Sequence, residues 1–334
     1  MFLVRRPLLA AAGLAAPLVL AGCRERQSTL NPASHAARDI ADLWWGMLIG
    51  SSIVVSVVTL LVVVAALRAR GRREAAQEDG RGSRGLVFVG GFVVPILVLI
   101  TLFVLTLRTL PATSAPRGHT DLTVQVTGRQ WFWDVRYLGG TTATTANELH
   151  IPVRRPVRLI AKTADVIHSF WVPELNRKID MIPGKTNSIL LEADHAGTYR
   201  GQCAEFCGLQ HAHMAFLVVA EAPARFRSWL ANEARPARKP TTLSQRRGLG
   251  VFTSVGCGGC HTIAGTKATG TIGPNLTHLA SRRTLAAATI PNAGGYLAGW
   301  ILDPQHVKPG NRMPGFDLAG NQVQELLDYL RSLK

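Results

Sequence analysis

Residues 201–214 read GQCAEFCGLQHAHM, so that two cysteines, two histidines, a glutamate and a methionine fall between Cys203 and Met214. Three interpretations are open: a disulfide turn, a zinc site or a copper site. A structural zinc site requires four nitrogen or sulfur ligands in a closed tetrahedron, whereas thiolate, imidazole and thioether ligands together favour copper. A copper site with a single metal ion of the blue type uses one cysteine. The second cysteine therefore favours two thiolates that bridge two copper ions.

The residues around this stretch predict a β-sheet domain over residues 112–234. Short runs rich in β-branched and aromatic residues alternate with turn residues, as in a β-sandwich or a Greek-key barrel. The runs are DLTVQVTG (121–128), QWFWDVRY (130–137), PVRLIAKTA (156–164), TNSILLEAD (186–194) and MAFLVVAEA (214–222). A rigid β-scaffold that holds metal ligands on its loops suits electron transfer, because such a site moves little when it gains an electron.

Four motifs in this domain resemble cytochrome c oxidase subunit II, which carries a binuclear copper A site. Residues 203–214 match its pattern of two cysteines around a glutamate, a histidine four residues on and a methionine three residues further. The other motifs are DVIHSFWVPEL (165–175), KIDMIPG (178–184) and GRQWFW (128–133). The resemblance extends from the first long apolar run onward and implies a cupredoxin-like β-sandwich.

The resemblance implies six ligands for the copper pair: two bridging thiolates, two imidazoles, a weak thioether and a backbone carbonyl. Cys203 and Cys207 would provide the thiolates, and His168 and His211 the imidazoles. Met214 would provide the thioether and Glu205 the backbone carbonyl. The carboxylate of Glu205 would also face a magnesium site shared with subunit I. His195 and His213 are interpreted as residues on the surface or behind the ligands.

Trp131 matches the tryptophan through which electrons enter the copper site in this family. The alternative interpretation is a core aromatic residue. Trp131 and Trp133 are two residues apart, which would place both on one face of a strand. We retain Trp131 as the candidate for electron transfer.

Residues 257–261 read CGGCH, the attachment signature of a c-type haem. The thiols of Cys257 and Cys260 are spaced to reach both vinyl groups of haem, and the adjacent His261 then falls on the iron. Met313 is the predicted second axial ligand, since KPGNRMPGF (308–316) and GPNL (273–276) resemble class I cytochromes c. Histidine and methionine together raise the haem potential, as suits an electron carrier. The competing ligands are His278 and His306.

The haem motif predicts an all-α class I cytochrome c domain over residues 243–334, joined by a proline- and charge-rich linker over 235–242. The run QVQELLDYLRSLK (322–334) places Val323, Leu326, Leu327 and Leu330 on one helical face. The resemblance implies that this helix packs across an earlier helix near residues 243–255. Because each of the four cysteines in the two domains then has a metal or haem to bind, disulfides are disfavoured.

The N-terminus predicts a lipoprotein signal peptide over residues 1–22. A basic start, an apolar run and the sequence LAGC (20–23) resemble a bacterial lipobox, in which Cys23 carries lipid after cleavage. The alternative is an uncleaved membrane anchor with an incidental cysteine.

Residues 43–67 and 86–108 predict two transmembrane helices, because each contains an uncharged apolar run long enough to cross a bilayer. The connecting loop is rich in arginine, which places it in the cytoplasm by the positive-inside rule. These arginines are Arg68, Arg70, Arg72, Arg73, Arg81 and Arg84. Both soluble domains would then lie on the extracytoplasmic face of a bacterial cell membrane. The formal net charge of +16 could suggest binding to nucleic acid, but this topology excludes nucleic acid as a partner.

Taken with the resemblance, the sequence predicts subunit II of a caa-type cytochrome c oxidase with a fused cytochrome c. Electrons would pass from haem c to copper A and then to subunit I, which reduces oxygen and pumps protons. Subunit I, a subunit III, membrane lipid and a donor, either cytochrome c or a membrane-bound cytochrome complex, are the expected partners. The alternatives are the equivalent subunit of a nitric oxide reductase, a free-standing membrane electron carrier and a copper-delivery lipoprotein.

Overall fold

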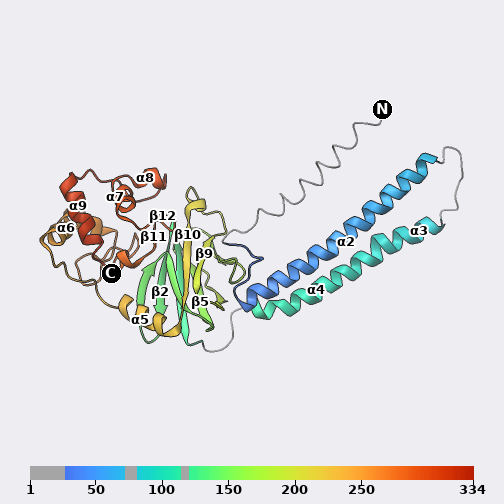
Figure 1. Cartoon of the computed structure of the whole chain (residues 1–334), viewed down its shortest axis with the longest axis horizontal. Coiled ribbons are helices and arrows are strands. Elements are labelled where there is room, and N and C mark those ends of the chain that lie inside the picture. Colours follow the sequence, from blue (N-terminus) through green and yellow to red (C-terminus); the bar gives the residue numbers. More distant parts are fainter. Residues whose placement is uncertain (1–26, 72–80, 114–119) are drawn as a thin grey trace, which may run out of the picture.

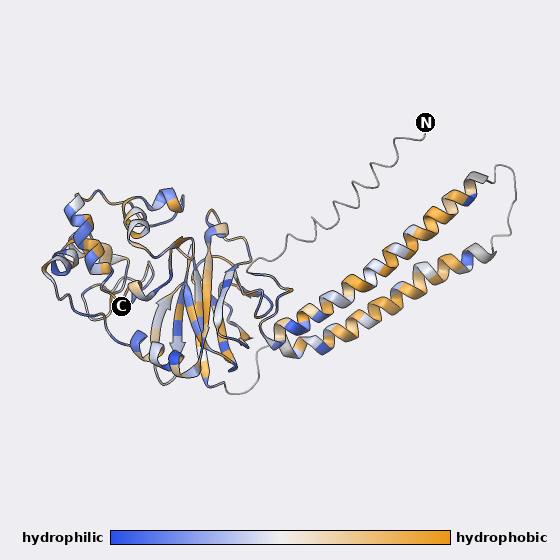
Figure 2. Cartoon of the chain, in the orientation of Figure 1, coloured by the Kyte–Doolittle hydropathy of each residue, from blue (hydrophilic) through white to orange (hydrophobic). Residues whose placement is uncertain are grey.

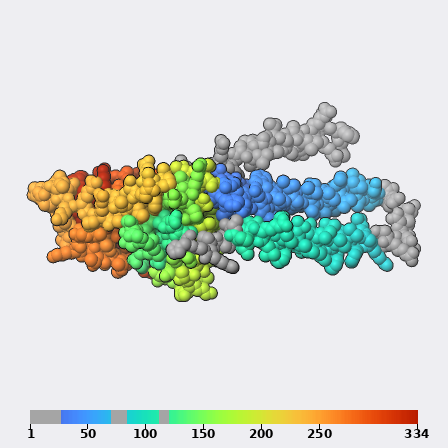
Figure 3. Space-filling model, turned by 90° about the horizontal axis from the view of Figure 1, so that it is seen from below, coloured from blue at the N-terminus to red at the C-terminus, as the bar shows by residue number. Residues whose placement is uncertain are grey.

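The computed structural model describes residues 27–71, 81–113 and 120–334. The predicted signal peptide, Cys23, Arg72 and Arg73 lie outside the described residues. Two membrane helices, a β-domain and a helical domain follow one another along the long axis of the molecule (Figures 1 and 3). This order confirms the predicted fold class.

The two long apolar helices lie side by side, and hydrophobic residues predominate along both of them in the view of Figure 2. The first is α2 (His35–Gly71). The second begins with α3 (Arg81–Phe88), passes through a π-helical turn, η1 (Val89–Val93), and continues as α4 (Val94–Thr113). Segments of 35 and 28 residues, with mean hydropathies of 2.7 and 2.8, are long and apolar enough to cross a membrane.

The first membrane helix is fixed to the β-domain at its N-terminal end. The backbone N–H of Ala33 donates to the carbonyl of Glu174 at 2.8 Å, and the carbonyl of Ala33 accepts from Asp194 at 2.8 Å. The guanidinium of Arg38 also pairs with the carboxylate of Asp194. The β-domain therefore lies directly against the N-terminal end of α2.

The β-domain is a sandwich of two five-stranded sheets, with the strand orders β3-β2-β1-β5-β8 and β4-β10-β9-β6-β7. The first sheet contains β1 (Leu122–Arg129), β2 (Phe132–Leu138), β3 (Ala143–Ala146), β5 (Val157–Thr163) and β8 (Asn187–Leu191). The second contains β4 (Glu148–Pro152), β6 (His168–Trp171), β7 (Ile179–Met181), β9 (Gly197–Cys203) and β10 (Ala215–Glu221). Both sheets mix parallel and antiparallel pairs, since β1 pairs in parallel with β5 and β4 with β10.

Side chains that alternate along the strands fill the space between the sheets. On β1, Val124 and Val126 are buried while their neighbours are partly exposed. Trp133 from the first sheet packs edge-on against Phe170 and Phe216 from the second, at ring distances of 5.9 and 5.0 Å. This cupredoxin-like core supports the inner strands β6 and β9, whose ends lie at one end of the sandwich.

The helical domain follows α5 (Pro223–Glu233), which packs on the sandwich through Phe226 and Trp229. It contains α6 (Leu243–Ser254), α7 (Gly294–Leu302), α8 (Pro304–Val307) and α9 (Gly320–Leu330), with a short hairpin of β11 (Thr284–Leu285) and β12 (Ile290–Pro291). The predicted apolar face of the last helix is confirmed, because Leu326, Leu327 and Leu330 are buried.

Helices α6 and α9 cross at Gly248. A Cβ at this position would lie 1.9 Å from the carbonyl oxygen of Glu325, so only glycine permits the contact. Helix α6 begins with a capping box between Thr242 and Gln245. The crossed pair forms one wall of the pocket described below.

Candidate metal and cofactor sites

The first candidate site lies where the ends of β6 and β9 and the loop before β10 meet at one end of the sandwich. The Sγ atoms of Cys203 and Cys207 are 3.8 Å apart. The Nδ1 of His168 lies 3.8 Å from the first sulfur, and the Nδ1 of His211 lies 3.6 Å from the second. A disulfide requires a bond of about 2.05 Å, so the two sulfurs are separate thiols facing two imidazoles.

The two remaining predicted ligands also face the thiols. The Sδ of Met214 is 3.8 Å from the Sγ of Cys207, and the carbonyl oxygen of Glu205 is 3.2 Å from the Sγ of Cys203. Two thiolates, two imidazoles, a thioether and a carbonyl therefore converge on one small volume. This soft donor set fits copper, and the paired thiols fit a site with two metal ions.

The environment of the thiols favours metal binding. The hydrogen bond from Cys207 lowers the pKa of Cys203 to about 3, although burial acts to raise it and His168 assists the lowering. The same interaction raises the pKa of Cys207. The interaction between the two sulfurs therefore favours the thiolate form of Cys203, and thiolate is the form of cysteine that binds metals.

Asp165 orients one of the imidazoles and was missed from the sequence. Its Oδ1 accepts a hydrogen bond from Nε2 of His168 at 2.8 Å, which leaves Nδ1 free to face the thiols. Burial raises the pKa of Asp165, but hydrogen bonds from the backbone of Gln130, from His168 and from the backbone of Val166 outweigh it and lower the pKa. The residue is therefore a carboxylate, as an acceptor for the imidazole N–H must be.

We expect Asp165→Asn to weaken copper binding by roughly 10–100-fold, the usual cost of losing a partner behind a metal ligand. Titration against a copper chelator, followed by the absorption of the copper centre, measures the effect. Asp121→Asn is the matched control, since Asp121 lies at the surface and pairs with the exposed Arg155. Equal copper affinity in the two variants would contradict the role of Asp165.

Trp131 lies in the turn between β1 and β2, outside both strands. Its indole Nε1 donates to the carbonyl of Cys207 at 3.0 Å. Trp133, by contrast, is buried between the sheets. The expectation that the two indoles share a strand face is wrong, because β2 begins only at Phe132 and the indole of Trp131, in the turn before it, contacts the backbone carbonyl of Cys207.

His195 and His213 are both exposed. The Nδ1 of His213 lies 3.0 Å from the side-chain oxygen of Gln210. Both positions fit the interpretation of these histidines as residues outside the ligand set.

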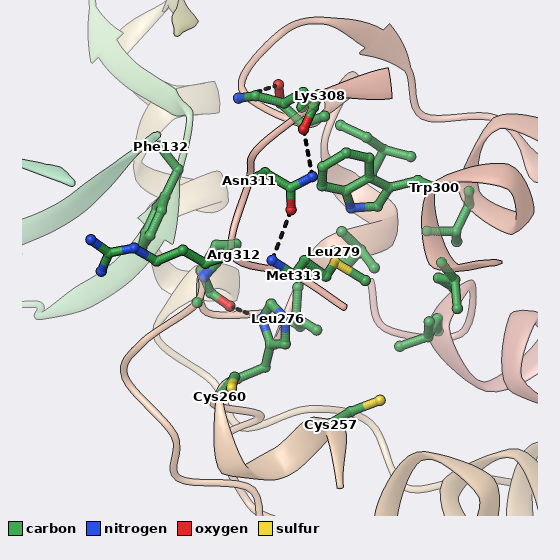
Figure 4. A pocket seen from close by; sticks show the side chains of 18 of the residues that line it. Phe132, Cys257, Cys260, Leu276, Leu279, Trp300, Lys308, Asn311, Arg312 and Met313 are labelled. Atoms are coloured by element: carbon green, nitrogen blue, oxygen red, sulfur yellow. Dashed lines mark hydrogen bonds between the residues drawn. The ribbon is translucent and has the colours of Figure 1, made fainter. Parts of the chain in front are cut away.

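The second candidate site is a crevice in the helical domain, lined by Cys257, Cys260, His261 and Met313. Figure 4 shows both cysteines at one end of the crevice and Met313 beyond them. The backbone N–H of Met313 donates to the side chain of Asn311 at 2.8 Å, which fixes the loop that carries the methionine. Neither His278 nor His306 is among the described residues that line the crevice.

The imidazole of His261 is oriented for a ligand in the crevice. Its Nδ1 donates to the carbonyl of Pro274 at 2.8 Å, so that Nε2 remains available as an acceptor. Gly273 packs on the ring, since a Cβ there would lie 2.6 Å from it. Burial lowers the pKa of His261 against the opposing effect of the Pro274 carbonyl. The neutral form, which binds iron, is therefore favoured.

The crevice fits a haem in both its walls and its polar groups. The walls are apolar and consist largely of Phe252, Leu276, Leu279, Leu285, Leu297, Trp300, Ile301, Phe316, Leu326 and Leu330. Two donors in this lining, Nε of Arg282 and Oγ1 of Thr284, are buried and have no hydrogen-bond partner among the described residues. Unpaired buried donors are costly, and the carboxylates of a haem are suitable acceptors for them.

The two sites meet at the Trp131 turn. Gln130, Trp131 and Phe132 of the β-domain line the same crevice as the haem motif, and Figure 4 shows Phe132 on its strand facing it. The side-chain Nε2 of Gln130 donates to the carbonyl of Cys207 at 2.9 Å. Arg312 of the helical domain donates to the side-chain oxygen of Gln130 at 3.1 Å. One short segment thus contacts both candidate sites.

Comparison with known families gives two matches. The family described as "Cytochrome C oxidase subunit II, periplasmic domain" matches residues 140–221, and the family described as "Cytochrome c" matches residues 245–334. The first match includes the two thiols, and the second includes the haem motif.

The chain is also similar to curated proteins over nearly its whole length. It is 33% identical to cytochrome c oxidase subunit 2 of Alkalihalophilus pseudofirmus, over 95% of this chain and 94% of that protein. It is 29% identical to the protein of the same name from Bacillus subtilis, over 95% of each. Among solved structures, the periplasmic domain of subunit II (CoxB) from Bradyrhizobium japonicum is 32% identical. That match has a TM-score of 0.34 and covers 35% of this chain and 95% of the domain.

Proposed function

Because the chain belongs to the family of cytochrome c oxidase subunit 2, we propose that it receives electrons on a covalent haem c and passes them through a binuclear copper A site to subunit I. Subunit I then reduces oxygen and pumps protons. The chain is a membrane subunit of a terminal oxidase and joins an oxidase domain to a cytochrome c domain.

The observation that carries this proposal is the shared Trp131 turn. The turn lines the haem crevice, and the indole of Trp131 donates to the carbonyl of Cys207 in the copper site. A single side chain and one hydrogen bond therefore connect the two cofactor sites. This arrangement supports electron transfer within the chain and supports Trp131 as the residue that connects its two cofactors.

We assign the copper ligands as His168, Cys203, Glu205, Cys207, His211 and Met214, and the haem groups as Cys257, Cys260, His261 and Met313. When bound, the copper pair and the haem each take up and release one electron. The chain supports this by holding buried or partly buried ligands on the inner strands β6 and β9 and on the loop that follows β9, which limits rearrangement when the charge changes. The Asp165 and Pro274 acceptors fix the imidazole orientations.

Purification of the complex with its metal and haem content provides the test. We expect a pair of copper ions and one covalent haem on this chain, co-purification of subunit I, and oxygen consumption with reduced cytochrome c as donor. A complete, stable chain without a haem-bearing membrane partner would instead favour a free-standing carrier. A single exchangeable copper would favour copper delivery, and uptake of nitric oxide in place of oxygen would favour a nitric oxide reductase.

Trp131→Phe is expected to keep both cofactors and to slow electron transfer from haem to copper by about tenfold, the equivalent of one lost hydrogen bond of roughly 1.4 kcal/mol in the activated complex. Flash reduction of the haem followed by copper absorption measures this rate. Trp229→Phe is the control, because Trp229 packs on Tyr137 and His150 away from the haem crevice. An unchanged rate in the Trp131 variant would remove this residue from the path.

The same proposal extends to the surroundings of the chain. Glu205 would share Mg²⁺ with subunit I, a subunit III would complete the complex, and Cys23 would carry lipid. The soluble domains would lie on the extracytoplasmic face, with cytochrome c or a membrane-bound cytochrome complex as donor. Mass spectrometry of the mature N-terminus and protease accessibility in sealed vesicles test the lipid and the orientation separately.

A further inference from the structure

Lys308 is a buried lysine between the two candidate sites. It follows α8 in the helical domain and is 3% exposed. Its ammonium donates to the carbonyls of His213 at 2.9 Å, Trp131 at 3.0 Å and Ala286 at 3.3 Å. An ammonium has three protons and no acceptor, so these three carbonyls satisfy it completely.

The three carbonyls come from three separate backbone segments. Trp131 belongs to the turn that lines the haem crevice, His213 to the loop between two proposed copper ligands, and Ala286 to the helical domain. Burial lowers the pKa of Lys308 to about 7, against the opposing electrostatic effect of the nearby Cys207 side chain. The three carbonyls are therefore the acceptors that hold this buried side chain between the segments.

Hydrogen bonds connect the backbone of Lys308 to the proposed haem ligand Met313. The side chain of Asn311 donates to the carbonyl of Lys308 at 2.7 Å and accepts from the backbone N–H of Met313 at 2.8 Å. On the copper side, Gln210 donates to the carbonyl of Pro309 at 2.6 Å. Figure 4 shows Lys308, Asn311 and Met313 in one continuous chain of hydrogen bonds. The proposed axial methionine and the copper loop are thus held by one short segment.

The segment that supplies Ala286 is a strained turn. Ala286, Ala287 and Ala288 have φ angles of 51°, 59° and 57°, which L-residues rarely adopt. Its carbonyls face the β-domain: Ala287 accepts from the backbone of Ala215 at 3.2 Å, and Ala288 accepts from Arg200 at 3.0 Å. A strained backbone persists where its surroundings hold it, and here contacts between the domains do so.

Building on the function proposed above, we propose that Lys308 is a positioning residue for electron transfer from haem to copper. It holds the Trp131 turn, the copper loop and the haem crevice in one docked arrangement. Its charge also lies against the carbonyl of His213, between the proposed copper ligands His211 and Met214, and a positive charge there favours the reduced state of the copper site. Loss of the ammonium should therefore slow transfer between the sites and lower the reduction potential of copper.

The test compares Lys308→Met with Lys267→Met in the full chain within the purified complex. Lys267 is an exposed lysine of the same domain outside the crevice lining. Laser-flash photoreduction by a flavin delivers electrons to haem, and the absorption of haem and copper is followed in time. We expect an unchanged bimolecular reduction of haem in both variants, transfer to copper about tenfold slower in Lys308→Met only, and a lower copper potential in that variant.

The outcomes separate this proposal from the function on which it rests. If the unmodified chain shows no haem-to-copper transfer, the proposed function fails. If it transfers and Lys308→Met matches it in rate and copper potential, the role of Lys308 is overturned. Should Lys308→Met fail to load its cofactors, Arg200→Gln decides, because it removes the contact with Ala288 and leaves the lysine in place. Slower transfer in that variant supports docking control, and an unchanged rate overturns it.

Discussion

Replacing His211 by alanine is expected to abolish the absorption of the copper centre and to reduce oxygen uptake by about 100-fold or more. Loss of a residue behind a ligand already costs roughly 10–100-fold, and His211 is itself a proposed ligand, with Nδ1 3.6 Å from the Sγ of Cys207. Haem c should remain reducible, because the crevice lining does not include His211. Absorption spectra, copper content and oxygen consumption measure the three effects.

His213→Ala is the matched control for this variant. Both histidines belong to the same short helical turn, but the side chain of His213 is exposed and contacts Gln210. The contact between Lys308 and the carbonyl of His213 survives the substitution, since it involves only the backbone. Normal oxygen uptake in His211→Ala would mean that electrons reach subunit I without the copper site, and the proposed relay would be wrong.

The sequence offered candidate ligand sets but did not identify the residues that orient them. Five of the six proposed copper ligands lie within residues 203–214, so their spacing alone brings them together. Asp165 and Pro274 act through single hydrogen bonds to His168 and His261. Asp165 stands in the quoted motif DVIHSF three residues before the histidine, and that spacing was the available signal.

Residues at the junction of the two domains could not be predicted from local patterns. Lys308 contacts Trp131 across 177 positions of sequence, and nothing in a basic residue before a proline distinguishes a buried ammonium from a solvated one. The same holds for Arg282, which is buried beside the haem crevice although arginines are mostly exposed. Their roles arise only when the helical domain docks on the sandwich.

Strand boundaries explain the one incorrect expectation. The two-residue period applies within a strand, whereas Trp131 belongs to the turn before β2. A tight turn between antiparallel strands reverses the chain, so the indoles of Trp131 and Trp133 diverge. One reaches the carbonyl of Cys207 and the other fills the core. The two-residue strand pattern holds for Trp133, which lies in β2, but not for Trp131, which lies before it.

The double variant Cys257→Ala/Cys260→Ala removes both attachment cysteines. It should lose covalent haem and, with it, oxygen uptake when cytochrome c is the electron donor. Haem staining of the denatured chain measures attachment directly. The crevice walls are apolar side chains, among them Phe252, Leu279 and Trp300, and without haem they face a void or water. Burial of apolar surface contributes about 25 cal/mol per Å², so we also expect a less stable domain and faster proteolysis in the linker at 235–242.

Met313→Ala separates attachment from ligation in the same crevice. Both cysteines remain, so haem should stay bound to the denatured chain, while loss of the thioether lowers the haem potential, since methionine raises it. The driving force for electron transfer from haem to copper would then increase. The driving force for reduction of haem by a donor such as cytochrome c would decrease. Covalent haem in the double cysteine variant, or an unchanged potential in Met313→Ala, would contradict the assignment of these residues. The pair of variants therefore distinguishes a crevice that only encloses haem from one whose own side chains set its potential.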